Sequence, residues 1–278
     1  MTRPLLEVQG LTVTFPGRDG PHTVVRDVSF TVGREKVGIV GESGSGKSMT
    51  ARAILDLVPP PGQVQAERLV FDGQELRSMP ARARARLRGR RISMILQDPR
   101  HALNPVMTVG TQLVETFKLH HRLSSRAARE RSLQSLDAVH IRDPQRVLDL
   151  YPHEISGGMG QRVMIAMMLA PDPELLLADE PTSALDATVE AGVLETLDEL
   201  VTARGMGLVL VSHDLDLVSA FCDRVLVFYA GRIVEALEAR DLGAARHPYT
   251  QGLLACVPRL GERRAELPVL QRDESWTR

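Results

Sequence analysis

The chain contains 278 residues, of which 43% are hydrophobic and 25% charged, and its formal net charge is -1 at pH 7. This length allows one large core, with or without a small appendage, and the near-zero charge argues against a mainly electrostatic nucleic-acid binder. Two cysteines, far apart and without a CxxC pattern, argue against a disulfide framework or a thiolate metal site. The sequence shows neither a secretory signal nor an apolar stretch of about 18 residues, so we expect a cytoplasmic protein that does not itself span a bilayer.

The first part of the chain predicts short strands that lead into a glycine-rich loop. Apolar and β-branched runs separated by turn residues predict strands at Leu5–Val8, Leu11–Phe15, Val24–Val32 and Lys36–Val40. The last strand runs directly into Gly41–Ser48, which fits GxxxxGK[ST] at every fixed position. Helical spacing of apolar residues over Lys47–Leu57 predicts a helix after the loop.

A loop of this kind binds phosphates. Its glycines allow backbone N–H groups to surround the phosphates, and the following helix presents its positive end to them. We therefore expect Lys47 to reach the β- and γ-phosphates of a nucleotide, and the Ser48 hydroxyl to ligate Mg²⁺.

The middle of the chain is helix-forming and charge-rich, and beyond it apolar strands alternate with amphipathic helices. The middle predicts helices at Val109–Leu119 and Ser125–Val139, with Ser125 as N-cap. The later part predicts strands at Leu175–Ala178, Leu208–Val211 and Val225–Tyr229, and helices at Gln161–Leu169, Val189–Ala203 and Leu215–Phe221. Such alternation indicates a parallel sheet with helices on its faces. A final hairpin begins at Ala230, and beyond about Arg246 the tail breaks the pattern.

Polar side chains suited to nucleotide hydrolysis follow three of the apolar strands. Asp179 can hold Mg²⁺, and Glu180 beside it can polarise the water that attacks the γ-phosphate. Gln97 ends another strand, where its amide can ligate the metal, and His213 follows a third. Because parallel strands bring their carboxyl ends to one sheet edge, we expect these groups near the phosphate loop.

A second glycine-rich element, Ser156-Gly157-Gly158, lies too far along the chain to belong to the phosphate loop. It precedes the helix predicted to start near Gln161, so its hydroxyl and amides could form an anion site. An ordinary glycine-rich N-cap is the alternative. Together with the first loop, the element favours a chain that holds one triphosphate and covers that of a neighbour.

In this order, the motifs resemble those of the nucleotide-binding subunits of ABC transporters, over about Leu5 to Leu254. The elements with counterparts in that family are Gly41–Ser48 (Walker A), Gln97 (Q-loop), Ile155–Arg162 (signature), Leu175–Glu180 (Walker B with the catalytic glutamate), Ser183–Asp186 (D-loop) and His213 (switch histidine). Phe15 stands where the family commonly places a Tyr against adenine, and it keeps the aromatic face without the hydroxyl.

The resemblance also implies which residues bind ligands. The implied nucleotide contacts are Phe15, Gly41, Glu42, Ser43, Gly44, Ser45, Gly46, Lys47, Ser48, Met49, Gln97, Ser156, Gly157, Gly158 and Gln161. The implied metal ligands are Ser48, Gln97 and Asp179, and the implied catalytic residues are Lys47, Glu180 and His213. The cofactors would be ATP and Mg²⁺. Some related proteins hold a four-cysteine iron–sulfur cluster, but two cysteines cannot ligate one, so no cluster is expected.

The implied fold is α/β: a RecA-like P-loop NTPase core with an N-terminal antiparallel β subdomain and an α-helical signature subdomain. The nucleotide-binding domain would span residues 1–245, with the helical subdomain at about 100–165. Residues 246–278 form a C-terminal tail that resembles the extension of oligopeptide transporters.

Two segments resemble the branch that serves oligopeptide, dipeptide and nickel importers. They are Gln97–Pro99 with Leu103–Pro105, and His247–Thr250. The branch implies an ATP-hydrolysing subunit that energises import from the cytoplasmic face of the inner membrane. Its partners would be a second ABC ATPase subunit (identical or not), two transmembrane permease subunits and an extracytoplasmic solute-binding protein. We expect the permeases to dock on the helical region between Gln97 and Leu150.

Three other interpretations remain open from the sequence. An ABC ATPase of DNA repair or translation is less favoured, because a long coiled-coil insertion and a duplicated unit are both missing. A subunit of a phosphonate-degrading complex would be separated from an importer only by its gene neighbours. Nucleic-acid binding through alternate arginines lacks interleaved aromatics, so a solvated basic face is favoured; these arginines are Arg82, Arg84, Arg86, Arg88, Arg90 and Arg91.

Overall fold

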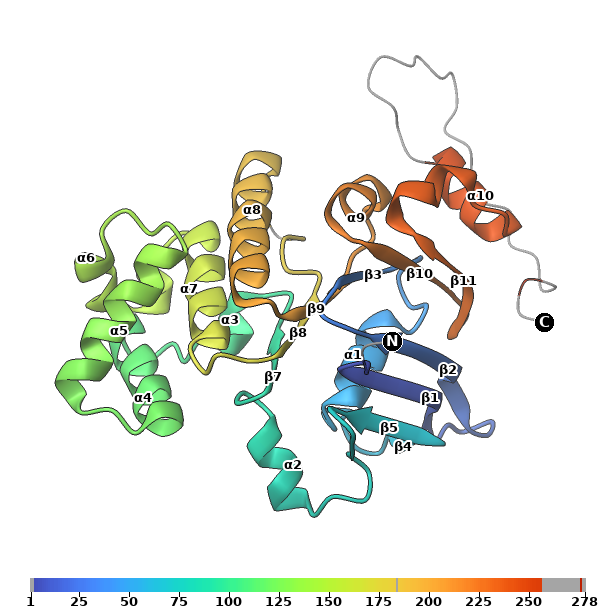
Figure 1. The fold of residues 1–278 in the computed structure, drawn as a ribbon, viewed down its shortest axis with the longest axis horizontal. Helices are drawn as coiled ribbons and strands as arrows, with labels where there is room; N and C mark the ends of the chain where they lie inside the picture. Colours follow the sequence, from blue (N-terminus) through green and yellow to red (C-terminus); the bar gives the residue numbers. More distant parts are fainter. Residues whose placement is uncertain (1–2, 184, 257–275, 277–278) are drawn as a thin grey trace. The chain divides into compact units, whose positions relative to one another are not determined.

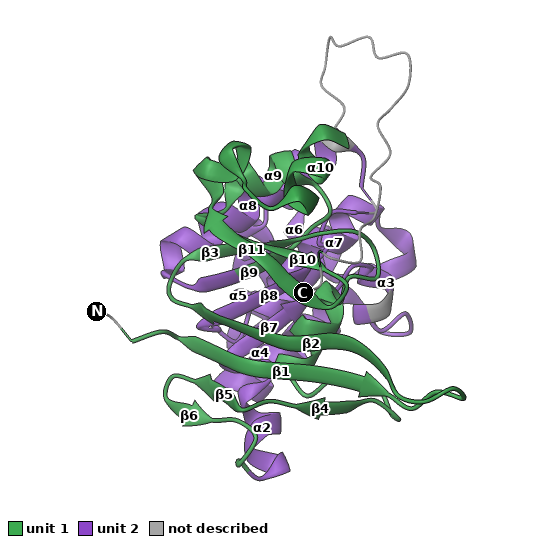
Figure 2. Cartoon of the chain, turned by 90° about the vertical axis from the view of Figure 1, so that its right-hand side faces the viewer, with its two compact units in different colours: residues 1–79, 209–278 green, residues 80–208 purple. Residues whose placement is uncertain are grey.

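The computed structural model describes residues 3–183, 185–256 and 276, and the chain divides into two compact units (Figure 2). Unit 1 is built from the two ends of the chain, residues 1–79 and 209–278, and unit 2 from residues 80–208. No helix within the described ranges is long and apolar enough to cross a membrane.

An antiparallel sheet forms one part of unit 1. Its strands are β1 (Leu6–Phe15), β2 (His22–Val32), β4 (Gln63–Gln65), β5 (Arg68–Phe71) and β6 (Gln74–Glu75), in the order β2-β1-β5-β6 with β4 also paired to β1. Two separate strands were predicted over β1, but the structure has one. The register shifts between Val8 and Leu11, where Gly10 takes a φ of +60°, so that Val8, Leu11 and Val13 are all buried.

The other part of unit 1 carries buried strands that lead to the phosphate loop. Here β3 (Lys36–Val40) pairs in parallel with β10 (Arg224–Tyr229), which pairs antiparallel with β11 (Arg232–Glu238). The helices of this part are α1 (Lys47–Ile54), α9 (Leu215–Phe221), η2 (Ala239–Ala244) and α10 (Pro248–Cys256). A side chain at Gly38 of β3 would lie 2.2 Å from Val218, so α9 packs closely over this strand.

Unit 2 combines a parallel strand pair with a group of helices. The strands β7 (Ile92–Ile95) and β8 (Leu175–Asp179) are fully buried, and an Arg91–Glu174 ion pair joins their beginnings. The helices are α2 (Ala81–Leu87), α3 (Pro99–Ala102), α4 (Val109–His121), α5 (Ser125–Ala138), α6 (Pro144–Leu148), η1 (Pro152–Glu154), α7 (Gly157–Leu169) and α8 (Ala187–Arg204). In Figure 1, α4 to α7 lie together. The chain passes back to unit 1 within β9 (Gly207–Val211).

Two helix starts differ from the prediction. Helix α5 is capped by Ser124, whose side chain accepts from the Ala127 N–H, and not by Ser125. Helix α7 begins at Gly157, four residues before the predicted start, because Ser156 caps it and tertiary packing outweighs the low helix propensity of glycine. Helix α2, which contains the alternate arginines, was not predicted at all.

Candidate functional site

The phosphate loop of unit 1 has its shape fixed by three glycines with positive φ. The φ values are +147° at Gly41, +80° at Gly44 and +99° at Gly46, a region that other residues rarely adopt. An added Cβ at Gly41 would lie 2.2 Å from the Phe228 carbonyl oxygen, and one at Gly46 would lie 2.6 Å from that of Val24. At Gly44 a Cβ would meet nothing within 4 Å. The loop is therefore packed against the strands of unit 1 on one side and open at Gly44.

Polar groups of this loop suit a phosphate chain. Lys47 is only 4% exposed, and its ammonium donates to the carbonyl oxygens of Gly41 (2.7 Å) and Glu42 (2.8 Å). The buried Ser45 hydroxyl has no hydrogen-bond partner among the residues that the structure describes. Such an orphaned polar group calls for a ligand, because burying it without a partner is costly.

Helix α1 adds its N-terminus to the loop. Its N-cap is Gly46, which has no side chain to satisfy the first N–H groups of the helix. Ser48 and Met49 lie half-buried in the first turn. The uncapped donors and the helix dipole both favour an anion here.

Unit 1 also contains His213 and Phe15. His213 is exposed and follows β9, where the Ser212 N–H donates to the Ile39 carbonyl of β3, the strand that enters the loop. Phe15 ends β1, and its ring lies against Gly62, whose added Cβ would approach the ring to 2.7 Å. These placements leave the expected roles of both residues as predictions.

In unit 2, Gln97 and Glu180 are in direct contact. The parallel register pairs Ile95 of β7 with Ala178 of β8, and each polar residue lies two positions beyond its member of that pair. The Gln97 amide donates to a Glu180 carboxylate oxygen at 3.1 Å. Glu180 has a φ of +46°, unusual for a residue with a long side chain, which holds it in a tight turn after the strand. Asp179 is the last residue of β8 and is 3% exposed.

The second glycine-rich element forms the start of α7. The Ser156 hydroxyl accepts from the Met159 N–H at 3.3 Å and so caps the helix, while Ser156 and Gly157 remain exposed. An added Cβ at Gly158 would lie 2.5 Å from Val189 of α8, so only glycine allows this approach. The element is therefore a glycine-rich N-cap, and its role as an anion site stays a prediction.

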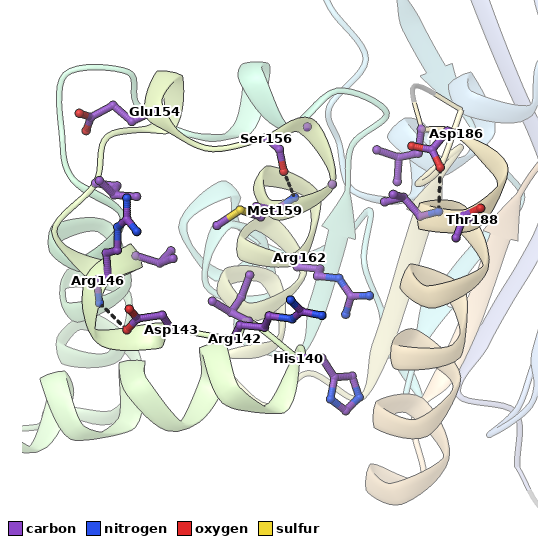
Figure 3. A pocket seen from close by; sticks show the side chains of 17 residues that line it. His140, Arg142, Asp143, Arg146, Glu154, Ser156, Met159, Arg162, Asp186 and Thr188 are labelled. Atoms are coloured by element: carbon purple, nitrogen blue, oxygen red, sulfur yellow. Dashed lines mark hydrogen bonds between the residues drawn. The ribbon is translucent and has the colours of Figure 1, made fainter.

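Figure 3 shows a cavity of about 790 Å³ that this element lines. Arg142, Arg146 and Arg162 also line it, together with Asp186 at the start of α8. The Arg162 guanidinium is held by the Val139 carbonyl and the Thr196 hydroxyl. Asp186 caps α8 by accepting from the Val189 N–H at 3.1 Å; Ala184, also in the predicted D-loop, lies outside the described residues.

Gln161 is buried, whereas Ser156 and Gly157 at the start of α7 are exposed. It is 1% exposed, and it lines a second cavity of about 600 Å³ together with Ser156, Gly157, Gln97, Leu103 and Ile155. Its amide nitrogen has no hydrogen-bond partner in the described part of the chain.

Sequence reasoning missed Tyr249. It is fully buried in unit 1, and its hydroxyl accepts from the Glu42 N–H of the phosphate loop at 3.0 Å. The segment His247–Thr250 was noticed only as a sign of the family branch, and no local pattern indicates this contact.

Comparisons with known proteins show the family to which the chain belongs. The family model described as ABC transporter matches residues 25–183. The dipeptide transport ATP-binding protein DppD of Escherichia coli (strain K12) is 47% identical over 269 residues, covering 95% of this chain and 82% of that protein. The oligopeptide transport ATP-binding protein OppD of Salmonella typhimurium is 48% identical over 265 residues, covering 95% and 79%.

Solved structures confirm the fold class. The dimeric post-hydrolysis state of the ATP-binding cassette MJ0796, bound to ADP and Pi, matches with a TM-score of 0.75 and 26% identity, covering 84% of this chain and 99% of that one. An ATP-binding subunit of an ABC transporter matches with a TM-score of 0.67 and 27% identity, covering 86% and 92%. The chain therefore belongs to the ABC transporter family, as an ATP-binding subunit similar to those of dipeptide and oligopeptide transport.

Proposed function

We propose that this chain hydrolyses ATP to power the import of short peptides. The observation that carries the proposal is 47% to 48% identity, over 95% of the chain, to ATP-binding proteins named for dipeptide and oligopeptide transport. The same relatives favour a peptide over nickel as the cargo. They also favour import over a role in phosphonate degradation. The phosphate loop and the Gln97–Glu180 pair supply the groups that ATP hydrolysis needs.

The phosphate loop would bind the triphosphate. Lys47 would exchange its two carbonyl acceptors for phosphate oxygens, and the Ser45 hydroxyl and the first N–H groups of α1 would donate to the same chain. No cluster of three or more His, Cys, Asp or Glu side chains suited to a metal occurs in the described ranges. Mg²⁺ does not require such a cluster, because it is usually bound through one or two carboxylates together with substrate phosphates and water. Ser48, Gln97 and Asp179 would hold it, and the ion would neutralise charge that develops on the phosphates.

Glu180 would act on the attacking water. Its carboxylate is oriented by the Gln97 amide, so a movement of Gln97 would change the position or the basicity of Glu180. A movement of the Q-loop would therefore change the rate of hydrolysis through the contact between Gln97 and Glu180. His213, exposed at the end of β9, would support the γ-phosphate.

A second ATPase subunit would complete each site. The exposed Ser156 hydroxyl and Gly157 amide lie at the N-terminus of α7, which favours an anion contributed by another protomer. The partner would be a second copy or a sister subunit, and the resemblance to a dimeric cassette supports such pairing.

The permease subunits would dock on unit 2. The apolar residues that line the groove of the second cavity include Leu103, Pro105, Pro152 and Ile155. Val106, which follows Pro105 in the sequence, is 79% exposed. Exposed apolar side chains that lie together are typical of a protein–protein contact. Docking there would hold the chain at the cytoplasmic face of the membrane and place its partner next to Gln97, which lines the same groove. An extracytoplasmic solute-binding protein would deliver the peptide to the permeases.

Purification of the chain from detergent-solubilised membranes, with its co-purifying proteins identified, tests this proposal. We expect two permeases and a peptide-binding protein, and ATP-dependent uptake of labelled di- or tripeptides after reconstitution into vesicles. Lys47→Ala should abolish uptake, whereas Arg240→Ala, at an exposed position outside the helical region, should not. Recovery of the chain without membrane proteins, or uptake that does not depend on Lys47, would contradict it.

A further inference from the structure

Helix α10 contacts the phosphate loop through the buried hydroxyl of Tyr249. Tyr249 is 0% exposed, and its hydroxyl accepts a hydrogen bond of 3.0 Å from the N–H of Glu42. The two residues are 207 positions apart in the sequence. Both belong to unit 1, so the contact is internal to one compact unit.

This hydrogen bond fixes a peptide group that Lys47 also uses. The Glu42 N–H and the Gly41 carbonyl belong to the same planar peptide unit, in which they point in opposite directions. The carbonyl accepts from the Lys47 ammonium at 2.7 Å, while the N–H donates to Tyr249. Tyr249 and Lys47 therefore hold the two ends of one peptide plane at the entrance of the loop.

Several contacts hold Tyr249 in place. The Arg246 and His247 N–H groups donate to a carboxylate oxygen of Glu235 on β11, at 2.7 Å and 3.2 Å. The Tyr249 N–H donates to Nδ1 of His247 at 3.2 Å. The Tyr249 ring lies 4.5 Å from the ring of Tyr229, centroid to centroid. These contacts fix the position of Tyr249 against β11 through Glu235 and against β10 through Tyr229.

We propose that Tyr249 is a positioning residue for ATP binding, and that the segment 246–256 is a structural part of the phosphate site. The inference rests on the proposed ATPase function. Lys47 must leave the Gly41 carbonyl for the phosphates, and the loop must keep its shape when it does. The Tyr249 hydroxyl holds the Gly41–Glu42 peptide during that exchange, because its bond does not involve Lys47.

Loss of the hydroxyl should weaken ATP binding and leave the chemical step unchanged. Without it, the peptide can rotate, and more conformational freedom must be lost when the loop closes on phosphates. Within unit 1, Tyr249 contacts the Glu42 N–H of the loop, His247 and the ring of Tyr229. The effect should therefore fall on KM and the ATP Kd rather than on kcat.

The test compares Tyr249→Phe with Tyr229→Phe in the full-length protein. Each variant removes one hydroxyl from the same aromatic cluster, but only Tyr249 bonds to the loop. We expect Tyr249→Phe to raise the KM and the Kd for ATP by about three- to tenfold, the usual effect of one hydrogen bond, with kcat within about twofold. Tyr229→Phe should match the wild type in all three quantities. Melting temperatures measured in parallel should stay close to that of the wild type for both variants.

Three results separate the possibilities. Unchanged ATP affinity in Tyr249→Phe would overturn the inference. Equal loss of affinity in both variants would also overturn it, because ring packing and not the hydroxyl would then be responsible. If the wild-type chain fails to bind ATP, the proposed function itself falls, and this outcome is visible before any variant is made.

Discussion

The side-chain amide of Gln97 and the carboxylate of Glu180 meet at 3.1 Å, at the ends of two adjacent parallel strands. The contact orients the residue expected to activate water, and it links that residue to the segment that leads into α3. The Asp98 side chain caps α3, so a displacement of this helix would pull on Gln97.

Replacing Gln97 should therefore slow hydrolysis more than it weakens binding. In Gln97→Ala the Glu180 carboxylate loses its orienting donor, and we expect kcat for ATP to fall by about tenfold with a much smaller change in KM. Steady-state ATPase kinetics measure both quantities. Gln134→Ala, on the exposed side of α5, serves as the control. A wild-type kcat in Gln97→Ala would show that the contact has no role in turnover.

Ser156 caps α7, and we also expect it to contact a nucleotide; two substitutions can separate these two roles. Ser156→Ala should lower the free energy of unfolding by about 1 kcal/mol, because α7 loses its N-cap. Ser156→Asp keeps a capping oxygen but adds a negative charge where a phosphate is expected, so stability should be retained while ATP turnover falls to below about a tenth of the wild-type rate.

Ser124, the N-cap of α5, provides the matched control for both substitutions. Ser124→Ala should cost a similar amount of stability, and Ser124→Asp should leave turnover unchanged. Denaturant unfolding and ATPase assays give the two readouts. Normal turnover in Ser156→Asp would remove Ser156 from the nucleotide site.

Substitution of Val106 tests whether the permease subunits dock on the groove of the second cavity. Val106→Asp places a charge on a side chain that is already 79% exposed, so we expect the melting temperature and the ATPase rate of the isolated chain to be unchanged. Recovery of permease subunits with the chain should drop sharply. Leu119→Asp, at a side chain that is 76% exposed and does not line the groove, should recover them normally. Equal recovery with both variants would place the docking surface elsewhere.

The stability of the segment that holds Tyr249 should depend on pH, because Glu235 accepts hydrogen bonds from Arg246 and His247. Burial alone would raise the pKa of Glu235, but the nearby Thr250 hydroxyl and the N–H groups of Arg246 and His247 hold this pKa below its ordinary value of 4.5. A lowered folded-state pKa contributes stability that is fully present above pH 4.5 and is lost as the pH falls through the folded-state pKa.

Glu235→Gln should accordingly melt at a lower temperature than the wild type at pH 7, and the difference should shrink below pH 4.5. Thermal melts over this pH range measure the difference, with the exposed Glu238→Gln as control. A difference that does not vary with pH would mean that the charge of Glu235 is not what holds the segment.

Local signals in the sequence predicted much of this architecture. Helix α9 occurs over the predicted residues, because Asp214 caps it and its apolar spacing is regular. Helix α2 was missed because its alternating Ala and Arg residues form no apolar stripe, and none of its residues is buried. The start of α7 was misplaced because two consecutive glycines are poor helix formers, while Ser156 and contacts with α8 decide the actual start.

In the candidate site, too, contacts that depend on tertiary packing could not be predicted from local sequence patterns. Gln97, Asp179 and Glu180 could be predicted together, since parallel strands bring their ends to one edge and these residues follow strand ends. The contact of Tyr249 with Glu42 could not, because it depends on how α10 packs on β10 and β11 after the chain has folded.

The role of Glu180 is the most direct test of the ATPase account. Glu180→Gln preserves the shape of the side chain and an oxygen that can accept from Gln97, but it removes the charge that polarises water. ATP affinity and ATP turnover should be measured side by side, with the exposed Glu199→Gln as control. We expect turnover to fall by at least about a hundredfold while the ATP Kd stays within about threefold of the wild type. Near-normal turnover in Glu180→Gln would contradict the account.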